Sequence, residues 1–171
     1  SGGATTIVHI QNPQTRLSAF DLVAPPRHDH LHGANVVETE ASLHRITPAR
    51  LEAAAKVFAP QLAHLPRPLV AVLIGGSNAC YQLTPKIIAN LALQLRSLCL
   101  NQGVGLAVTP SRRTGSDNIA ALRKALDGLP AVVWDFTGNN PYFGYLGLAD
   151  AIIVTCDSVN MVTEACATGK P

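Results

Sequence analysis

Near the C-terminus, a group of polar side chains follows a short run of β-branched residues. The run 151–154 (Ala-Ile-Ile-Val) is typical of a strand buried on both faces of a parallel sheet. Asp157, Ser158 and Asn160 come next, and each could cap the helix that the sequence predicts after this strand. The first N–H groups of such a helix and its dipole favour an anion, and Glu164 lies within two turns, near enough to reach a sugar hydroxyl. The pattern predicts a seat for a phosphate-bearing ligand, unless Asp157 or Ser158 only caps the helix and Glu164 is solvated.

A second group suited to a ligand is Gly75-Gly76-Ser77-Asn78, which directly follows the apolar run 69–74. Paired glycines let a backbone approach a ligand closely, and the Ser77 hydroxyl can donate to a phosphate oxygen. The spacing matches neither a P-loop nor G-x-G-x-x-G. A plain tight turn explains the two glycines equally well.

Two further loops carry positive charge and aromatic surface. In the segment 111–114 (Ser-Arg-Arg-Thr), Arg112 and Arg113 offer bidentate donors to a diphosphate at a strand end, although a solvated loop is the alternative. In the segment 135–140, backbone groups could pair with the edge of a base. Phe136 could pack on that base, or it could belong to the core.

Strands and helices must position these loops, and the hydrophobic pattern predicts both. Apolar runs predict strands, while helical spacing that begins after Thr-Pro or ends before Gly predicts helices. The expected strands are 5–10, 21–24, 36–39, 69–74, 105–109, 131–134 and 151–154. The expected helices are 48–60, 85–100, 118–126, a short one after Pro141, and one after 157–160.

Strands alternate with helices from residue 69 onward, which predicts an α/β fold with a Rossmann-like, doubly wound parallel sheet. In such a sheet, ligands bind at the carboxyl ends of the strands near the point where the strand order reverses, so we expect the four loops to gather there. Residues 47–171 would form a nucleotide-binding lobe. Residues 1–46 would be the remainder of an N-terminal lobe and a linker. Because a further strand is expected after 169–171, we expect a fragment of a two-lobed protein whose bare sheet edge favours self-association.

The composition argues against several classes of protein. Of the 171 residues, 47% are hydrophobic and 14% charged, which is unlike a disordered chain. A net charge of +2 is too small and too scattered for a nucleic-acid binder, so we expect a small anionic ligand. No apolar run is long enough to span a bilayer and no secretory leader is visible, although peripheral membrane association stays open. The four cysteines form no C-x-x-C pair, which favours reduced thiols and a cytoplasmic location.

The segment 27–32 (Arg-His-Asp-His-Leu-His) raises the question of a metal site. On an extended chain, His28, His30 and His32 would share one face, and histidine and aspartate are good metal ligands. A loop between short strands can also hold histidines by ordinary hydrogen bonds. We expect the second arrangement, with no metal bound.

Taken in order, the motifs resemble a known family along essentially the whole chain. The segments that carry the resemblance are Val-His-Ile-Gln-Asn-Pro (8–13), Phe-Asp-Leu-Val (20–23), Pro-x-His-Asp (26–29), Asn-Val-Val-x-Thr (35–39), Gly-Gly-Ser-Asn (75–78), Ser-Arg-Arg-Thr (111–114) and the final Ala-Asp to Gly-Lys-Pro segment (149–171). The set is similar to the mitochondrial-fission "elongated mitochondria" family of plants and bacteria. More distantly, it resembles the C-terminal lobe of GT-B glycosyltransferases, including the enzymes that add N-acetylglucosamine to the peptidoglycan lipid precursor.

The resemblance implies a nucleotide-sugar pocket, with the ribose at Glu164, the diphosphate at the Gly-Gly-Ser turn and the base at Phe136-Thr137. The candidate binding residues are Gly75, Gly76, Ser77, Asn78, Ser111, Arg112, Arg113, Phe136, Thr137, Ser158, Met161 and Glu164. Asn78-Ala79-Cys80 lacks the further glycine common in the glycosyltransferases, and their last donor-sugar segment is absent. No catalytic base can be assigned without the acceptor lobe. His28 and Asp29, which match the family pattern, are candidates for a role in a cleft between lobes.

Three functions remain open at this point. The first is a GT-B-like glycosyltransferase of unknown acceptor, which stabilises a departing diphosphate with helix N–H groups and arginines and requires neither a metal nor a tightly bound cofactor. The second is an interaction module that recruits a dynamin-like GTPase, as the plant relatives imply, on the cytosolic face of the outer mitochondrial membrane. The third is a sugar-nucleotide epimerase, which would need an acid/base pair that the sequence does not reveal.

Overall fold

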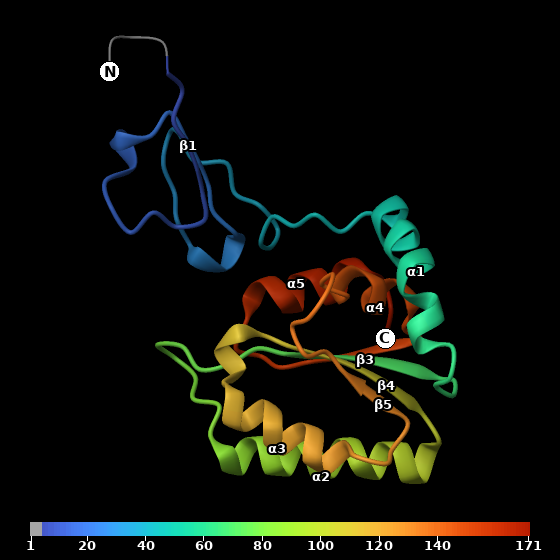
Figure 1. The fold of residues 1–171 in the computed structure, drawn as a ribbon. Helices are drawn as coiled ribbons and strands as arrows, with labels where there is room; N and C mark the ends of the chain where they lie inside the picture. The colour runs from blue at the N-terminus through green and yellow to red at the C-terminus, as the bar shows by residue number, and fades with distance from the viewer. Residues whose placement is uncertain (1–4) are drawn as a thin grey trace. The chain divides into compact units, whose positions relative to one another are not determined.

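The computed structural model describes residues 5–171 (Figure 1). The chain divides into two compact units, Ser1–Arg45 and Ile46–Pro171. Each unit is described by itself.

The first unit contains a small parallel sheet. Strands β1 (Val8–Ile10) and β2 (Leu22–Ala24) pair in parallel, and two 3-10 turns, η1 (Leu17–Ala19) and η2 (Arg27–Asp29), lie in the segments that follow each strand. The prediction of a strand at 36–39 is wrong, because this segment forms only isolated bridges, at Val36 and at Thr39. Backbone bonds hold this segment, from the N–H of Val37 to the carbonyl of Val23 at 2.9 Å and from the N–H of Thr39 to the carbonyl of Pro25 at 2.8 Å. The Thr39 hydroxyl adds bonds to the carbonyls of Pro25 at 3.2 Å and Ala41 at 2.8 Å.

The second unit is the predicted α/β fold. Its strands are β3 (Leu69–Ile74), β4 (Gly105–Pro110), β5 (Ala131–Val133) and β6 (Ala151–Val154). Its helices are α1 (Pro48–Leu62), α2 (Pro85–Gln102), α3 (Ser116–Leu126), α4 (Tyr142–Leu148) and α5 (Val159–Ala167), with the 3-10 turn η3 (Arg112–Thr114) before α3. All four strands are parallel, in the order β5-β4-β3-β6, which confirms the Rossmann-like parallel sheet.

Threonine caps start the two long helices as predicted. Thr47 accepts a hydrogen bond from the N–H of Arg50, and Thr84 accepts one from the N–H of Ile87. Each threonine is followed by a proline at the first helical position, where a missing N–H costs nothing. Helix α1 continues two residues past Pro60, beyond the predicted end, and ends at Leu62.

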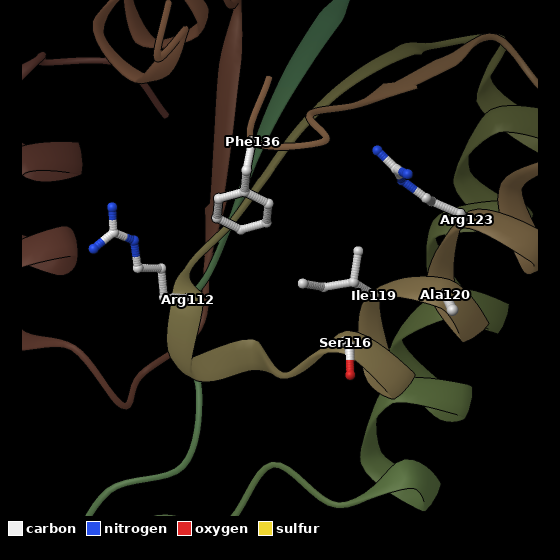
Figure 2. A pocket seen from close by; sticks show the side chains of 6 residues that line it. All are labelled: Arg112, Ser116, Ile119, Ala120, Arg123 and Phe136. Atoms are coloured by element: carbon white, nitrogen blue, oxygen red, sulfur yellow. The ribbon is translucent and has the colours of Figure 1, made fainter. Parts of the chain in front are cut away.

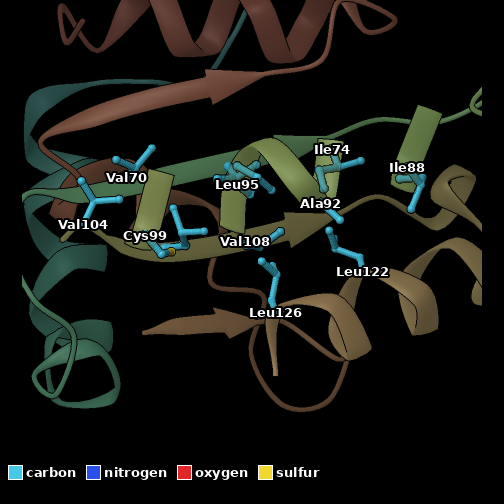
Figure 3. Packing of buried hydrophobic residues seen from close by; sticks show 12 residues of the cluster. Val70, Ile74, Ile88, Ala92, Leu95, Cys99, Val104, Val108, Leu122 and Leu126 are labelled. Atoms are coloured by element: carbon cyan, nitrogen blue, oxygen red, sulfur yellow. The ribbon is translucent and has the colours of Figure 1, made fainter. Parts of the chain in front are cut away.

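Helices cover both faces of the sheet (Figure 1). Helices α2 and α3 pack on the face that Val70, Val72 and Ile74 of β3 present (Figure 3). The alternate side chains Ala71 and Leu73 meet α1, α4 and α5 on the other face. The helix that follows β3 and the helix that follows β6 therefore lie on opposite faces, although β3 and β6 are neighbours. This makes the carboxyl ends of β3 and β6 the switch point of the sheet.

Candidate functional site

The side chain of Asp157 occupies the switch point. Its carboxylate accepts a hydrogen bond from the N–H of Gly76 at 2.7 Å and one from the hydroxyl of Thr155 at 2.6 Å. Thr155 in turn accepts the N–H of Gly75 at 2.8 Å. Only 8% of the Asp157 side chain is exposed, so these bonds form in a largely water-free place. The turn after β3 is thus fastened to the turn after β6 through one buried carboxylate.

The paired glycines are required by these protein atoms. A Cβ on Gly75 would overlap the carboxylate of Asp157, and a Cβ on Gly76 would overlap the backbone carbonyl of Arg113. The sequence predicted a close approach of the glycine backbone to a ligand. The close approach that the structure contains is to Asp157 and Arg113, and it accounts for both glycines without a ligand.

Ser77 and Asn78 shape the loop that follows the glycines. The hydroxyl oxygen of Ser77 accepts the N–H of Leu83 at 2.9 Å, which leaves its proton able to serve another acceptor. The Asn78 amide donates to the carbonyl of Asp157 at 2.9 Å, and its oxygen accepts the N–H groups of Cys80 and Tyr81, each at 2.8 Å. Asn78 therefore holds the loop to the neighbouring turn.

Ser111 and Thr114 bind the third loop to the same place. Both hydroxyls donate to the carbonyl of Gly75, Ser111 at 2.8 Å. Arg113, between them, places a guanidinium nitrogen 3.5 Å from Asp157 Oδ2. Three of the four predicted loops therefore meet around Asp157, as the parallel sheet requires.

Arg112 lines a pocket that does not include Arg113. This open depression of about 520 Å³ is lined by Arg112, Ser116, Ile119, Ala120, Arg123 and Phe136 (Figure 2). Arg123 also donates to the carbonyl of Val133 at 3.3 Å. Arg113 thus pairs with Asp157 at the switch point, while the Arg112 guanidinium points away from Ser116 and Ile119 of α3 (Figure 2).

Phe136 is held in an unusual backbone conformation. Its φ of 67° is in the left-handed region, which is rare for a bulky side chain, and its ring packs on Trp134 with centroids 4.6 Å apart. The Asp135 carboxylate accepts hydrogen bonds from the hydroxyl and the N–H of Thr137, and these bonds hold its pKa below the usual range. Thr137 therefore stabilises the turn around Phe136 by bonding back to Asp135.

Helix α5 begins beside Asp157. Of the three predicted caps, Ser158 takes the N-cap position and accepts the N–H of Met161 at 3.4 Å, while the Asp157 side chain turns toward Gly76. The Met161 side chain packs against the buried cluster that includes Leu146 and Ala165.

Glu164 lies one turn further along α5, on the face shared with α4. Its Oε2 accepts a hydrogen bond from the hydroxyl of Tyr142 at 2.7 Å. Burial of the phenol, and then its bond to Glu164, raise the pKa of Tyr142, so the phenol stays a neutral donor. The prediction that Glu164 would be solvated or bound to a ligand did not include this partner.

A small cavity adjoins the Asp157 network. It measures about 220 Å³ and is lined by Gly76, Tyr81, Gln82, Leu83, Ile87, Thr155, Cys156 and Asp157. Sequence reasoning missed Thr155, Tyr81 and Gln82. The one available signal was the position of Thr155, which is the first residue after a strand that ends at the expected ligand edge.

The predicted binding residues thus form three groups. Gly75, Gly76, Ser77, Asn78, Ser111 and Arg113 gather at the switch point around Asp157. Arg112 and Phe136 line the pocket against α3, with Thr137 in the adjoining loop. Ser158, Met161 and Glu164 belong to α5. The last two groups lie toward opposite faces of the sheet, because α3 and α5 cover different faces.

The histidine segment of the first unit does not have the extended arrangement that a metal site would need. His28 and Asp29 lie in the 3-10 turn η2, with His28 Nε2 at 3.8 Å from Asp29 Oδ1, and His30 follows with a φ of 50°. The segment is therefore not extended. Within residues 5–171, no group of three or more His, Cys, Asp or Glu side chains is arranged to hold a metal ion. Over the same residues, no helix is both long and apolar enough to cross a membrane.

Comparison with known proteins gives a family match over the full length. A family model described as "Mitochondrial fission ELM1" matches residues 1–171. The chain is 35% identical over 194 residues to "Mitochondrial fission protein ELM1" of Arabidopsis thaliana, covering 96% of this chain and 44% of that protein. It is 29% identical over 149 residues to "Uncharacterized protein RP120" of Rickettsia prowazekii (strain Madrid E), covering 85% and 41%. The chain spans less than half the length of both relatives.

Proposed function

The chain belongs to the mitochondrial fission ELM1 family, and on that premise we propose that its second unit binds a nucleoside diphosphate sugar at the carboxyl edge of the parallel sheet. The observation that carries the proposal is the switch point between β3 and β6. Three loops converge there with an arginine, beside the start of a nine-residue helix. In open α/β sheets, this crevice is where ligands bind, and helix N-termini favour phosphate.

Each part of the ligand has candidate partners at this edge. Arg113, with Arg112 beside it in the chain, would neutralise the diphosphate, and Ser77 has a hydroxyl proton to give. Glu164 would accept from a ribose hydroxyl, since the Tyr142 bond uses only part of the capacity of a carboxylate. The backbone of the loop 136–140 would meet the base.

The reaction that fits such a ligand is glycosyl transfer. The arginines and the first N–H groups of α5 would stabilise charge on the departing diphosphate, which requires no metal. Residues outside this unit would bind the acceptor and supply a base. His28 and Asp29 remain candidates for a part in that step.

Binding is tested by calorimetry and thermal shift with UDP, GDP and their sugar conjugates. A ligand present at 100 times its Kd stabilises the folded state by about 2.7 kcal/mol, which a melting curve resolves easily. Glu164→Ala should lose most of the stabilisation that the nucleotide gives. Glu52→Ala, which removes an exposed carboxylate paired with Lys56 on α1, should keep it. If the wild-type chain ignores every nucleotide, the proposal fails.

A second candidate function is an interaction module. It is favoured by the switch-point network itself, in which Gly75, Gly76 and Asp157 are already joined by bonds within the protein. In this proposal, the unit is a preformed scaffold for a dynamin-like GTPase at the mitochondrial surface. Co-sedimentation with such a partner, unaffected by Glu164→Ala and by nucleotides, would support it over the transferase. A sugar-nucleotide epimerase would be distinguished by inversion of a labelled sugar without loss of the nucleotide.

A further inference from the structure

The buried carboxylate at the switch point bears on which nucleotide the site takes. We infer that Asp157 is a specificity residue that makes the site prefer an intact nucleoside diphosphate sugar over the free nucleoside diphosphate. This inference rests on the proposed function and adds to it a residue and a ligand preference.

Asp157 is fixed beside the place where the proposed function puts the diphosphate. Its oxygens accept the N–H of Gly76 at 2.7 Å and the hydroxyl of Thr155 at 2.6 Å, and only 8% of the side chain is exposed. Gly75 backs directly onto the carboxylate, so the side chain has little room to move. A diphosphate seated at Arg113 would therefore lie beside this carboxylate.

The charge at Arg113 is already shared. Its guanidinium is 3.5 Å from Asp157 Oδ2, so the carboxylate offsets part of the charge that Arg113 brings to the seat. The positive potential that remains at the seat comes from the start of α5. Such a seat tolerates a modest negative charge and disfavours each further one.

The two ligands differ by one charge at this place. In a nucleoside diphosphate sugar, both phosphates are diesters and carry one charge each. Release of the sugar leaves a terminal phosphate whose second pKa is about 6, so at pH 7.5 it carries most of a further charge. That charge appears on the phosphate nearest the lost sugar, and Asp157 repels it. The carboxylate would thus favour substrate over product and speed product release, a step that limits many enzymes.

Asp157→Asn tests the inference, because asparagine keeps the size of the side chain and can still accept the N–H of Gly76. The measurement is the ratio of the Kd for UDP-glucose to the Kd for UDP, with GDP-mannose and GDP as the second pair. The variant should shift the ratio in favour of the free diphosphate by about tenfold, the size expected for one unit charge across a partly solvated site. Asp127→Asn makes the same change at an exposed residue after α3 and should leave the ratio unchanged.

A second measurement needs no variant. The β-methyl ester of UDP has no sugar, and its terminal phosphate carries one charge as in the sugar conjugate. Wild-type protein should bind this ester more tightly than UDP. Equal binding of the ester and UDP, or an unchanged ratio in folded Asp157→Asn, overturns the role of Asp157 while the proposed function stands. If neither form of either nucleotide binds, the proposed function itself fails.

Discussion

The hydroxyl of Tyr142, at the first residue of α4, donates a hydrogen bond to Glu164 Oε2 of α5 at 2.7 Å. Both helices lie on the same face of the sheet, so this bond joins neighbouring elements that are 22 residues apart in the chain. A carboxylate that already has one fixed partner has a defined orientation, which a ribose hydroxyl could use. The tyrosine is therefore a candidate positioning residue for the proposed ligand.

Removing that donor should weaken the fold measurably. In Tyr142→Phe, Glu164 loses a charge-assisted bond in a half-buried place, and we expect a loss of about 1–2 kcal/mol in the free energy of unfolding. Urea denaturation at pH 7 measures it. Tyr81→Phe deletes the same hydroxyl from a side chain that is 46% exposed, and its midpoint should match wild type. A loss in Tyr142→Phe no larger than in this control would show that the bond contributes nothing.

Thr114 should couple the second and third loops. The residue is 2% exposed, accepts the N–H of Ser111 at 3.0 Å and donates to the carbonyl of Gly75. Thr114→Val keeps the shape but removes both bonds, so we expect a loss of about 1–2 kcal/mol in unfolding free energy. Thr114→Ser retains the hydroxyl and should recover most of the loss in the same denaturation experiment. Equal losses in both variants would assign the effect to packing of the methyl group.

Much of the fold could be predicted because its signals are local. The apolar run 69–74 and the Thr84-Pro85 start of α2 each depend on neighbours in sequence, and both are observed. Asp157 shows where local reasoning ends. A helix cap was a sound expectation, but the residue instead bonds Gly76, 81 positions earlier in the chain. A partner that only the folded sheet brings close leaves no trace in the local pattern.

The sequence predicted where the candidate site lies better than it predicted which residues contact each other there. Parallel strands alone determine that the loops after β3, β4 and β6 meet. They do not determine side-chain direction, and Arg112 and Arg113 diverge although they are adjacent. Phe136 likewise turns its ring toward α3 from a backbone conformation that no propensity predicts for phenylalanine.

Leu122 should be one of the costliest side chains to shorten. It is fully buried on α3, within the cluster between the sheet and helices α2 and α3 (Figure 3). Leu122→Ala removes buried methyl groups and leaves a cavity, for which we expect a loss of about 2–5 kcal/mol in unfolding free energy. Leu93→Ala, at a side chain on α2 that is 66% exposed, should cost less than about 0.5 kcal/mol. Similar midpoints for the two variants would contradict this account of the core.

Asp150 should make stability depend on pH in the acid range. Its carboxylate accepts the N–H of Leu69 at 2.7 Å and pairs with Arg67 at 2.8 Å, and the backbone bond, followed by the arginine, holds the pKa of Asp150 below its usual value. A carboxyl group whose pKa is lower in the folded state stabilises that state above the unfolded pKa of about 3.9. The stabilisation is lost as the pH falls through the folded pKa.

Asp150→Asn isolates this contribution, because it keeps the shape and removes the charge. We expect wild type to be more stable by about 1 kcal/mol at pH 6, a modest value because the pair is partly exposed and screened by solvent. The difference should shrink as the pH is lowered below about 3.9, where the wild-type carboxyl becomes protonated and resembles the amide. Asp127→Asn, at an exposed carboxylate, supplies the baseline. A difference between Asp150→Asn and wild type that stays constant from pH 6 to pH 2.5 would mean that shape, and not charge, links the start of β3 to the start of β6.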